Sequence, residues 1–346
     1  MRVFRLEHEH YDLGPSAVAI GKFGGLHLGH QGVIERLREL ADQRGLVSVV
    51  ATFDRHPLSV LAPAHCPQPL VSPRRQTELF EATGVDAVAV LAFTRDFASL
   101  TPQEFVTDVL VGQLQAKLVL VGEDFTFGHR GAGTIDTLRE LGAKTGIEVV
   151  VAPTLRPDDN APKFSSSTVR DALARGDLDT VEAVLGRHHD VSGFVVHGAK
   201  RGRELGFPTA NLGPGDDPVT GEHREVEGFV PADGVYAGWL DVYAGDATGV
   251  EAGAVRRHPA AISVGTNPTF DGVPRTVEAH VIDRDDDDVT HFDLYGHWAR
   301  VVFVQRLRGM VAYTGLEPLI EQMRQDVDDA REALQHDAAS PSAPRR

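Results

Sequence analysis

The sequence predicts two different domains in one chain: an α/β domain with a doubly wound parallel sheet, followed by a compact β-barrel. Three observations predict this. A length of 346 residues corresponds to about two domains of typical size. In the first half, short apolar runs alternate with helical patterns, as in strand–helix–strand units. After about residue 187, β-rich runs are separated by Gly, Pro, Asn and Asp clusters instead of helices.

The predicted strands of the first half are near-continuous runs of Val, Ile, Leu and Ala. Such composition suits a parallel sheet that is covered on both faces. The runs are Ala17–Ile20, Val47–Thr52, Ala87–Leu91, Val119–Gly122 and Ile147–Val151.

Two helices of the first half carry clear start signals. Thr101, followed by Pro102 and Glu104, offers an N-cap, a proline at the first helical position and a glutamate at the third. Asp177 is the predicted N-cap of a helix that runs through Leu185 and ends at Gly186. The α/β domain is predicted to end at the same residue and therefore to span 1–186.

The second half predicts five or six strands and one helix, which is the make-up of a small barrel. We expect this domain to span 187–336 and the polar residues 337–346 to form a disordered tail. The expected helix has its apolar positions at helical spacing between Leu316 and Val327. The expected strands are Val191–His197, Val235–Val242, Ala260–Val264, Thr276–Ile282 and Arg300–Leu307.

Composition excludes several classes of function. The chain has 34 basic and 50 acidic residues, and its formal net charge of −16 repels a nucleic-acid backbone but leaves single nucleotides possible. One cysteine forbids an intramolecular disulfide and fits a reducing compartment. No apolar run approaches the roughly 20 residues of a membrane span, and the start lacks the apolar core of a signal peptide. We therefore expect a cytoplasmic protein without nucleic-acid or membrane partners.

The segment from Gly21 to His30 reads as a phosphate-binding turn, because it leaves a predicted strand and enters a predicted helix. Its glycines let the backbone approach a ligand closely. His27 and His30 are three residues apart, so both can project from one face at the helix start and contact phosphate oxygens. A glycine turn with two surface histidines is the alternative. A zinc site is disfavoured because further ligands are missing.

This HxGH pattern after a glycine turn resembles the nucleotidylyltransferase superfamily. Further segments restrict the resemblance to one family within this superfamily. The chain from about Ala17 to Ala333 resembles the bacterial bifunctional riboflavin kinase and FAD synthetase family. The resemblance implies a Rossmann-like nucleotidylyltransferase domain and a six-stranded riboflavin kinase barrel. The segments that carry it are Thr52–Pro57, Val121–Gly128, Ser165–Arg170, Gly193–Asn211 and Arg275–Glu278.

For the first domain, the resemblance implies transfer of an adenylyl group from ATP to FMN, with release of pyrophosphate. His27, His30 and Arg170 would act on the triphosphate as catalytic residues. Ser165 and Ser166 would donate to phosphate or simply cap the helix. The implied nucleotide- or flavin-binding residues are Gly21, Phe23, Gly25, Asp124, Ser165 and Ser166.

One departure from the family pattern lies in the turn itself. The family pattern is G-x-F-D-G-x-H-x-G-H, and this chain has Gly24 in place of the aspartate and Lys22 at a position where small or polar residues are common. Losing the carboxylate could loosen the loop, or it could reduce repulsion with the triphosphate. We expect adenylyl transfer to survive.

For the second domain, the resemblance implies phosphorylation of riboflavin. Gly198, Lys200 and Arg203 would form a positively charged flap over ATP, and Thr209 and Asn211 would hold Mg²⁺ with it through oxygen ligands. Glu278 matches the catalytic base. On a strand it shares a face with Thr276, so that it can point into the barrel site.

The sequence therefore predicts a transferase that converts riboflavin to FMN and FMN to FAD, with ATP as co-substrate and Mg²⁺ as cofactor. The expected partners are riboflavin, FMN and ATP, and the expected state is a monomer or weak homo-oligomer. One alternative is a kinase whose first domain is impaired or altered by Gly24. Another is a flavin-binding regulator without turnover.

Overall fold

The computed structural model describes residues 1–6, 13–156, 163–196, 209–216, 223–243, 255–265, 275–283, 294–311, 313 and 315–339. The chain divides into two compact units. The first unit comprises Met1–Gln68 and Pro73–Ser165, and the second comprises Pro69–Ser72 and Ser166–Arg346. The domain ranges 1–186 and 187–336 stay a prediction, since the units place residues 166–186 with the barrel.

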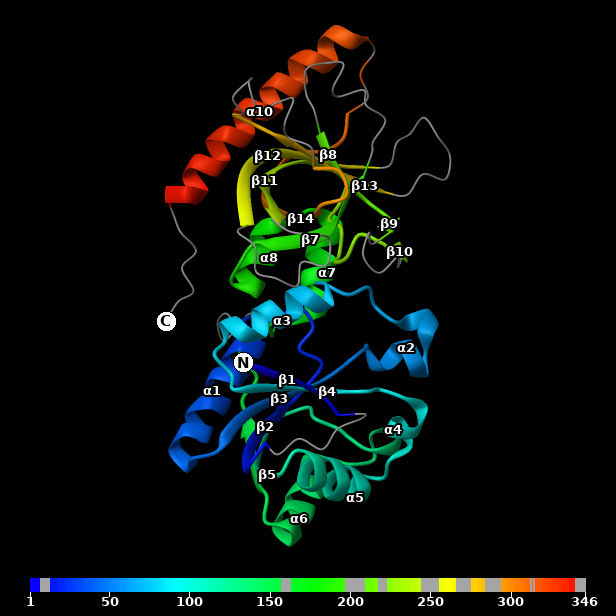
Figure 1. Ribbon diagram of the computed structural model, residues 1–346, viewed down its shortest axis with the longest axis vertical. Helices are drawn as coiled ribbons and strands as arrows, with labels where there is room; N and C mark the ends of the chain where they lie inside the picture. Colours follow the sequence, from blue (N-terminus) through cyan, green and yellow to red (C-terminus); the bar gives the residue numbers. More distant parts are fainter. Residues whose placement is uncertain are drawn as a thin grey trace. The chain divides into compact units, whose positions relative to one another are not determined.

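The first unit is built on a six-stranded parallel sheet in the order β1-β4-β3-β2-β5-β6 (Figure 1). This confirms the doubly wound α/β prediction. The order reverses at β2, whose neighbours are β3 on one side and β5 on the other, so the carboxyl ends of β2 and β5 flank the position where such sheets bind ligands. The strands are β1 (Arg2–Arg5), β2 (Ser16–Ile20), β3 (Val47–Phe53), β4 (Ala87–Leu91), β5 (Ala116–Gly122) and β6 (Glu148–Ala152).

The helices of the first unit begin and end with clear local signals. Thr101 and Glu104 form the predicted capping box: the Glu104 carboxylate accepts a hydrogen bond from the Thr101 N–H at 2.8 Å, and the Thr101 hydroxyl accepts one from the Glu104 N–H at 3.2 Å. The helices are α1 (Leu28–Arg44), α2 (Pro57–Leu61), α3 (Pro73–Ala82), α4 (Arg95–Ser99), α5 (Pro102–Glu104) and α6 (Ile135–Thr145), with the π-helix η2 (Phe105–Gln113) and the 3₁₀-helices η1 (Pro63–His65) and η3 (His129–Gly131).

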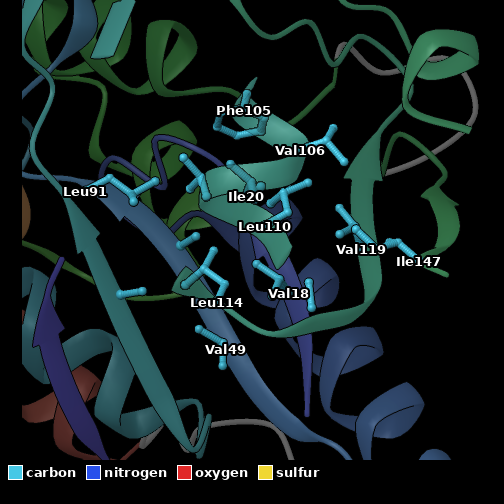
Figure 2. Packing of buried hydrophobic residues seen from close by; sticks show 14 of the residues in the cluster. Val18, Ile20, Val49, Leu91, Phe105, Val106, Leu110, Leu114, Val119 and Ile147 are labelled. Atoms are coloured by element: carbon cyan, nitrogen blue, oxygen red, sulfur yellow. The ribbon is translucent and has the colours of Figure 1, made fainter. Parts of the chain in front are cut away.

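A buried apolar cluster joins the sheet to η2 and α6. Val18, Val49 and Val119 lie on one face of the sheet and pack in the same cluster as Leu110 of η2 and Leu114, which directly follows it (Figure 2). Helix α1 packs on β2 and β3 outside this cluster. Helices therefore cover both faces, which is why the strands read as continuous apolar runs.

The second unit is a closed six-stranded barrel in the order β11-β12-β13-β8-β7-β14, as predicted (Figure 1). Helix α10 (Leu316–Ala339) packs on its outside against β11, β12 and β14. The strands are β7 (His189–Val196), β8 (Thr209–Gly213), β11 (Gly234–Tyr243), β12 (Val255–Gly265), β13 (Thr276–Val281) and β14 (Trp298–Arg308), with a small pair β9 (Gly215–Asp216) and β10 (His223–Arg224).

Within its described residues, the second unit also contains the helices α7 (Ser166–Arg175) and α8 (Leu178–Leu185). Asp177 caps α8 through the Thr180 N–H, and Gly186 ends it in the left-handed region, as predicted. Helix α10 continues to Ala339, so the first three residues of the expected tail are helical, and 340–346 lie outside the described residues.

A short piece of the first half belongs to the second unit. Residues Pro69–Ser72 group with the barrel although the chain on both sides belongs to the first unit. Leu70 is 2 % exposed, and its carbonyl accepts a hydrogen bond from the Phe229 N–H at 3.4 Å.

Candidate functional site

The glycine turn after β2 has a strained backbone. Gly25 takes a φ of 73°, and Phe23 and Leu26 take φ values of 44° and 42°, which side chains with a Cβ rarely adopt. Of the five non-glycine residues with positive φ in the described part of the chain, two are therefore in this turn. Both side chains are 2 % exposed, so core packing holds the strained backbone in place.

The predicted histidine pair begins α1 immediately after this turn. His27 is the N-cap, and its Nδ1 accepts a hydrogen bond from the His30 N–H at 3.3 Å. The two rings are stacked, with centroids 3.6 Å apart, and the edge of Phe23 packs on His30 at 5.2 Å. The structure thus brings together the glycine turn and both histidines, and the surface-histidine alternative is wrong for His27, which is buried.

Electrostatics keeps His30 neutral. Burial, reinforced by His27 and by the positive charge of Lys22, lowers the pKa of His30 well below its usual value. Its Nδ1 is buried and has no hydrogen-bond partner within the described residues. At neutral pH this imidazole can offer hydrogen bonds but carries no positive charge.

Polar side chains follow the neighbouring strands at the same edge of the sheet. Asp54, just after β3, accepts hydrogen bonds from the Phe93 N–H at 2.9 Å and the Arg55 guanidinium at 2.7 Å. Burial raises the pKa of Asp54, but these hydrogen bonds outweigh it and leave the pKa below its usual value. Asp124 follows β5 and pairs with Lys163, whose Nζ lies 2.9 Å from Oδ2.

An aromatic cluster near these strand ends was not singled out from the sequence. The ring of Phe53, at the end of β3, packs edge-on against Phe93 at 5.2 Å and Phe97 at 6.0 Å. Phe125 and Phe127, after β5, are stacked at 5.6 Å. Phe125 is only half-buried. The signal in the sequence was the placement of phenylalanines directly after predicted strands.

The serine run lies where the two units meet along the chain. Ser165 ends the first unit, and α7 begins at Ser166 in the second unit. Arg170 is half-buried on α7. The phosphate-binding roles of these residues stay predictions.

The barrel brings the other predicted residues together through strand register. Glu278 of β13 is directly opposite Asn211 of β8, and His280 is directly opposite Thr209. Directly opposite side chains in an antiparallel pair lie on one face, with Cβ atoms about 5 Å apart. The Asn211 Nδ2 donates to the Thr209 hydroxyl at 3.2 Å. Four polar side chains thus form one cluster, and His280 is a member that strand alternation alone could have identified.

The face that carries this cluster is the outer face of the barrel wall. The alternate residues Val277 and Ala279 are fully buried and align with Val264 and Ile262 of β12. Ala261, which aligns with His280, packs instead in the cluster with α10 outside the barrel. The interior is filled by apolar side chains and the polar row faces outward, so a site that Glu278 points into lies on the outer wall of the barrel and not in its interior.

Burial changes the pKa of the Glu278 carboxyl group. Desolvation raises the pKa of Glu278, and a hydrogen bond with the Thr276 side chain partly opposes this shift. A carboxylate with a raised pKa is a better proton acceptor near neutral pH. The flap residues Gly198, Lys200 and Arg203 lie outside the described residues.

Among the described residues, no group of three or more His, Cys, Asp or Glu side chains is placed to hold a metal ion. In the same part of the chain, no helix combines the length and the apolarity that crossing a bilayer requires.

Comparison with known proteins gives two family matches that together span most of the chain. The model of FAD synthetase matches residues 10–168, and the model of riboflavin kinase matches residues 185–334. The first range contains the glycine turn and the histidine pair. The second contains the Glu278–Asn211 cluster.

Curated relatives match over nearly their whole length. The bifunctional riboflavin kinase/FMN adenylyltransferase of Bacillus subtilis is 31 % identical over 95 % of this chain and 97 % of its own. The protein of the same description from Escherichia coli is 32 % identical over 91 % of each chain, and that of Pseudomonas fluorescens is 36 % identical over 94 % of each.

A solved structure shares the fold of the full chain. It is described as a macrolide-efflux protein from Streptococcus pneumoniae, with a TM-score of 0.77, 29 % identity and coverage of 96 % of this chain and 99 % of that one. This likeness establishes the shared fold and not a shared role.

Proposed function

This chain belongs to the family of bifunctional riboflavin kinases/FMN adenylyltransferases, and from that premise we propose which residues perform each reaction. The protein phosphorylates riboflavin to FMN with ATP, and it adenylylates FMN to FAD with release of pyrophosphate. The observation that carries the assignment of sites is the register that sets Glu278 opposite Asn211, together with the stacked His27–His30 pair at the turn after β2.

In the kinase reaction, Glu278 is the general base. The terminal hydroxyl of riboflavin must lose a proton as its oxygen attacks the γ-phosphorus of ATP, and ADP leaves. Glu278 accepts that proton, and its raised pKa, caused by burial, favours acceptance. Thr209 and Asn211, across the strand pair, hold the nucleotide beside this carboxylate.

The donor set of this cluster fits Mg²⁺. Because the Asn211 amide nitrogen is directed to the Thr209 hydroxyl, the amide oxygen remains available as a hard ligand beside that hydroxyl. Mg²⁺ held by Thr209 and Asn211 would neutralise charge on the phosphates of ATP.

In the adenylyl transfer, no proton has to be removed from the nucleophile. A phosphate oxygen of FMN attacks the α-phosphorus of ATP, and the bond to pyrophosphate breaks, so the protein mainly positions its substrates. The backbone of the turn at Gly21 and Gly25 and the imidazoles of His27 and His30 contact the triphosphate. Ser165, Ser166 and Arg170 add further donors to phosphate.

The aromatic cluster supplies the surface for the flavin ring. Phe125 is half-buried and stacked on Phe127, and Asp124 lies next to it at the end of β5. An isoalloxazine ring is flat and apolar, with a polar edge, so it suits an aromatic face beside a polar side chain.

The first test is a product analysis of the purified protein. Incubation of riboflavin, ATP and magnesium, followed by chromatography, is expected to give FMN first and then FAD. FMN without FAD would show that Gly24 has disabled the first unit and would favour the kinase-only alternative. Retention of flavin without either product would favour a regulator. A monomer or weak homo-oligomer and a cytoplasmic location stay part of the proposal.

A further inference from the structure

Asp124 places a full negative charge in a site that must bind a triphosphate. Its side chain is 79 % exposed, so the carboxylate is open to approaching ligands. The residue follows β5, which lies next to β2, and β2 leads into the glycine turn. A carboxylate near a bound triphosphate repels it, and the repulsion weakens binding of the anion.

Lys163 meets this carboxylate directly. Its Nζ lies 2.9 Å from the Asp124 Oδ2, and its own side chain is 53 % exposed. Lys22 of the glycine turn adds a second positive charge that acts on Asp124, and both lysines lower the pKa of Asp124. An exposed ion pair of this kind contributes little to the free energy of unfolding, so we consider its effect on the binding of the nucleotide instead.

The backbone after Lys163 is held against the histidine pair. The Phe164 N–H donates to the Leu155 carbonyl at 3.4 Å. A Cβ added to Gly29, between the two histidines in sequence, would lie only 3.2 Å from the Cβ of Phe164. The segment that carries Lys163 therefore runs beside the start of α1, where the triphosphate is expected.

We propose that Lys163 is a positioning residue for adenylyl transfer, which neutralises Asp124 and thereby sets the affinity of the first site for ATP. This inference rests on the proposed function of that site. Lys163 acts through Asp124 and takes no part in bond making or breaking, so its loss is expected to raise KM for ATP and leave kcat nearly unchanged.

The test is a double-mutant cycle measured as FAD formation from FMN and ATP. We expect K163M to raise KM for ATP about ten-fold, because it leaves the negative charge of Asp124 uncompensated at the edge of the sheet where the triphosphate is expected. K163R keeps the charge and should restore the KM to within about two-fold. In a D124N background, which removes the charge but keeps the shape, K163M should change KM by less than about two-fold.

Lys117 supplies the matched control. It is exposed at the amino end of β5, about 17 Å along the strand from its carboxyl end, so K117M makes the same charge change away from the site. K117M should leave KM for ATP unchanged. The effect of K163M should shrink at high salt, because the pair is exposed.

Two results would overturn the inference. One is an unchanged KM for ATP in K163M. The other is an equal rise in KM in both backgrounds, which would mean that Lys163 contacts the nucleotide itself. Far-ultraviolet circular dichroism of each variant reports intact folding of the first unit, which carries all three substituted positions. An absence of FAD from the unmodified protein would instead reject the proposed function of the first site.

Discussion

At the scale of the residue, Glu278 is the side chain on which the kinase reaction depends. We expect E278Q to fold and to reduce the turnover of riboflavin to FMN by about 100-fold, because the amide cannot accept the substrate proton. FAD formation from added FMN serves as the internal control and should stay unchanged. The measurement is initial-rate kinetics with product chromatography. Turnover within about three-fold of the unmodified protein would remove Glu278 from the role of base.

The sequence could predict individual residues where a motif or a period places them. His27 and His30 were predicted as a pair from their spacing, and the structure stacks them. Lys163 and the contact of Phe53 with Phe93 were not predicted, because their partners are distant in sequence. Lys163 and Asp124 are 39 positions apart, and only the sheet order brings them together.

At the scale of the element, an Arg–Asp–Arg cluster ties three strands of the barrel together. Asp241 of β11 has a fully buried side chain, and Arg257 of β12 and Arg300 of β14 are directly opposite it on either side. The guanidiniums donate to the carboxylate at 2.7 and 2.9 Å. Burial raises the pKa of Asp241, but the two arginines outweigh burial and lower it overall.

We expect D241N to destabilise the second unit by about 3 kcal/mol, because it leaves two guanidiniums without their carboxylate. Both tryptophans of the chain, Trp239 and Trp298, lie in the barrel, so their fluorescence during urea unfolding reports this unit. D328N, which breaks an exposed pair with Arg331, is the control and should cost less than about 0.5 kcal/mol. Equal effects of the two substitutions would contradict the prediction.

The strands and helices were predicted best where consecutive residues of the element are all buried. The five buried strands of the first unit were found, but β1 was missed, because its exposed Arg2, Val3 and Arg5 bury only Phe4 at the edge of the sheet. The helix after Thr101 was predicted, but not that it continues as the π-helix η2. That detail depends on packing against the sheet and not on a local signal.

At the scale of the whole molecule, the stability of the second unit should depend on pH through His189. This residue is 1 % exposed, and its Nε2 lies 2.7 Å from the Phe229 carbonyl oxygen. Burial lowers the pKa of His189 from 6.5 to about 4, although the nearby Asp190 partly opposes the shift. The unfolded chain therefore binds one more proton than the folded unit between these two values.

As pH falls from about 6.5 to about 4, this difference should remove about 3 kcal/mol of stability, with no further loss below the lower value. H189Q keeps a hydrogen-bond donor for the Phe229 carbonyl and does not titrate. Its unfolding free energy, followed by tryptophan fluorescence, should fall less steeply over this range. Parallel curves for the two proteins would exclude His189 as the cause.

The two-domain fold could be predicted because each half has its own periodicity, one of buried runs and helices and one of strands and turns. The division of the chain between the two units could not be predicted from the sequence. It depends on contacts between residues far apart in the sequence, such as the hydrogen bond from the Phe229 N–H to the Leu70 carbonyl.

The segment Pro69–Ser72 limits how the two activities can be separated into fragments. A fragment that starts at residue 166 retains every barrel strand but lacks Pro69–Ser72, which the intact protein contributes from upstream. No single cut in the gene yields both units complete, and a kinase fragment made in this way would lack the Leu70 carbonyl that accepts the hydrogen bond of the Phe229 N–H.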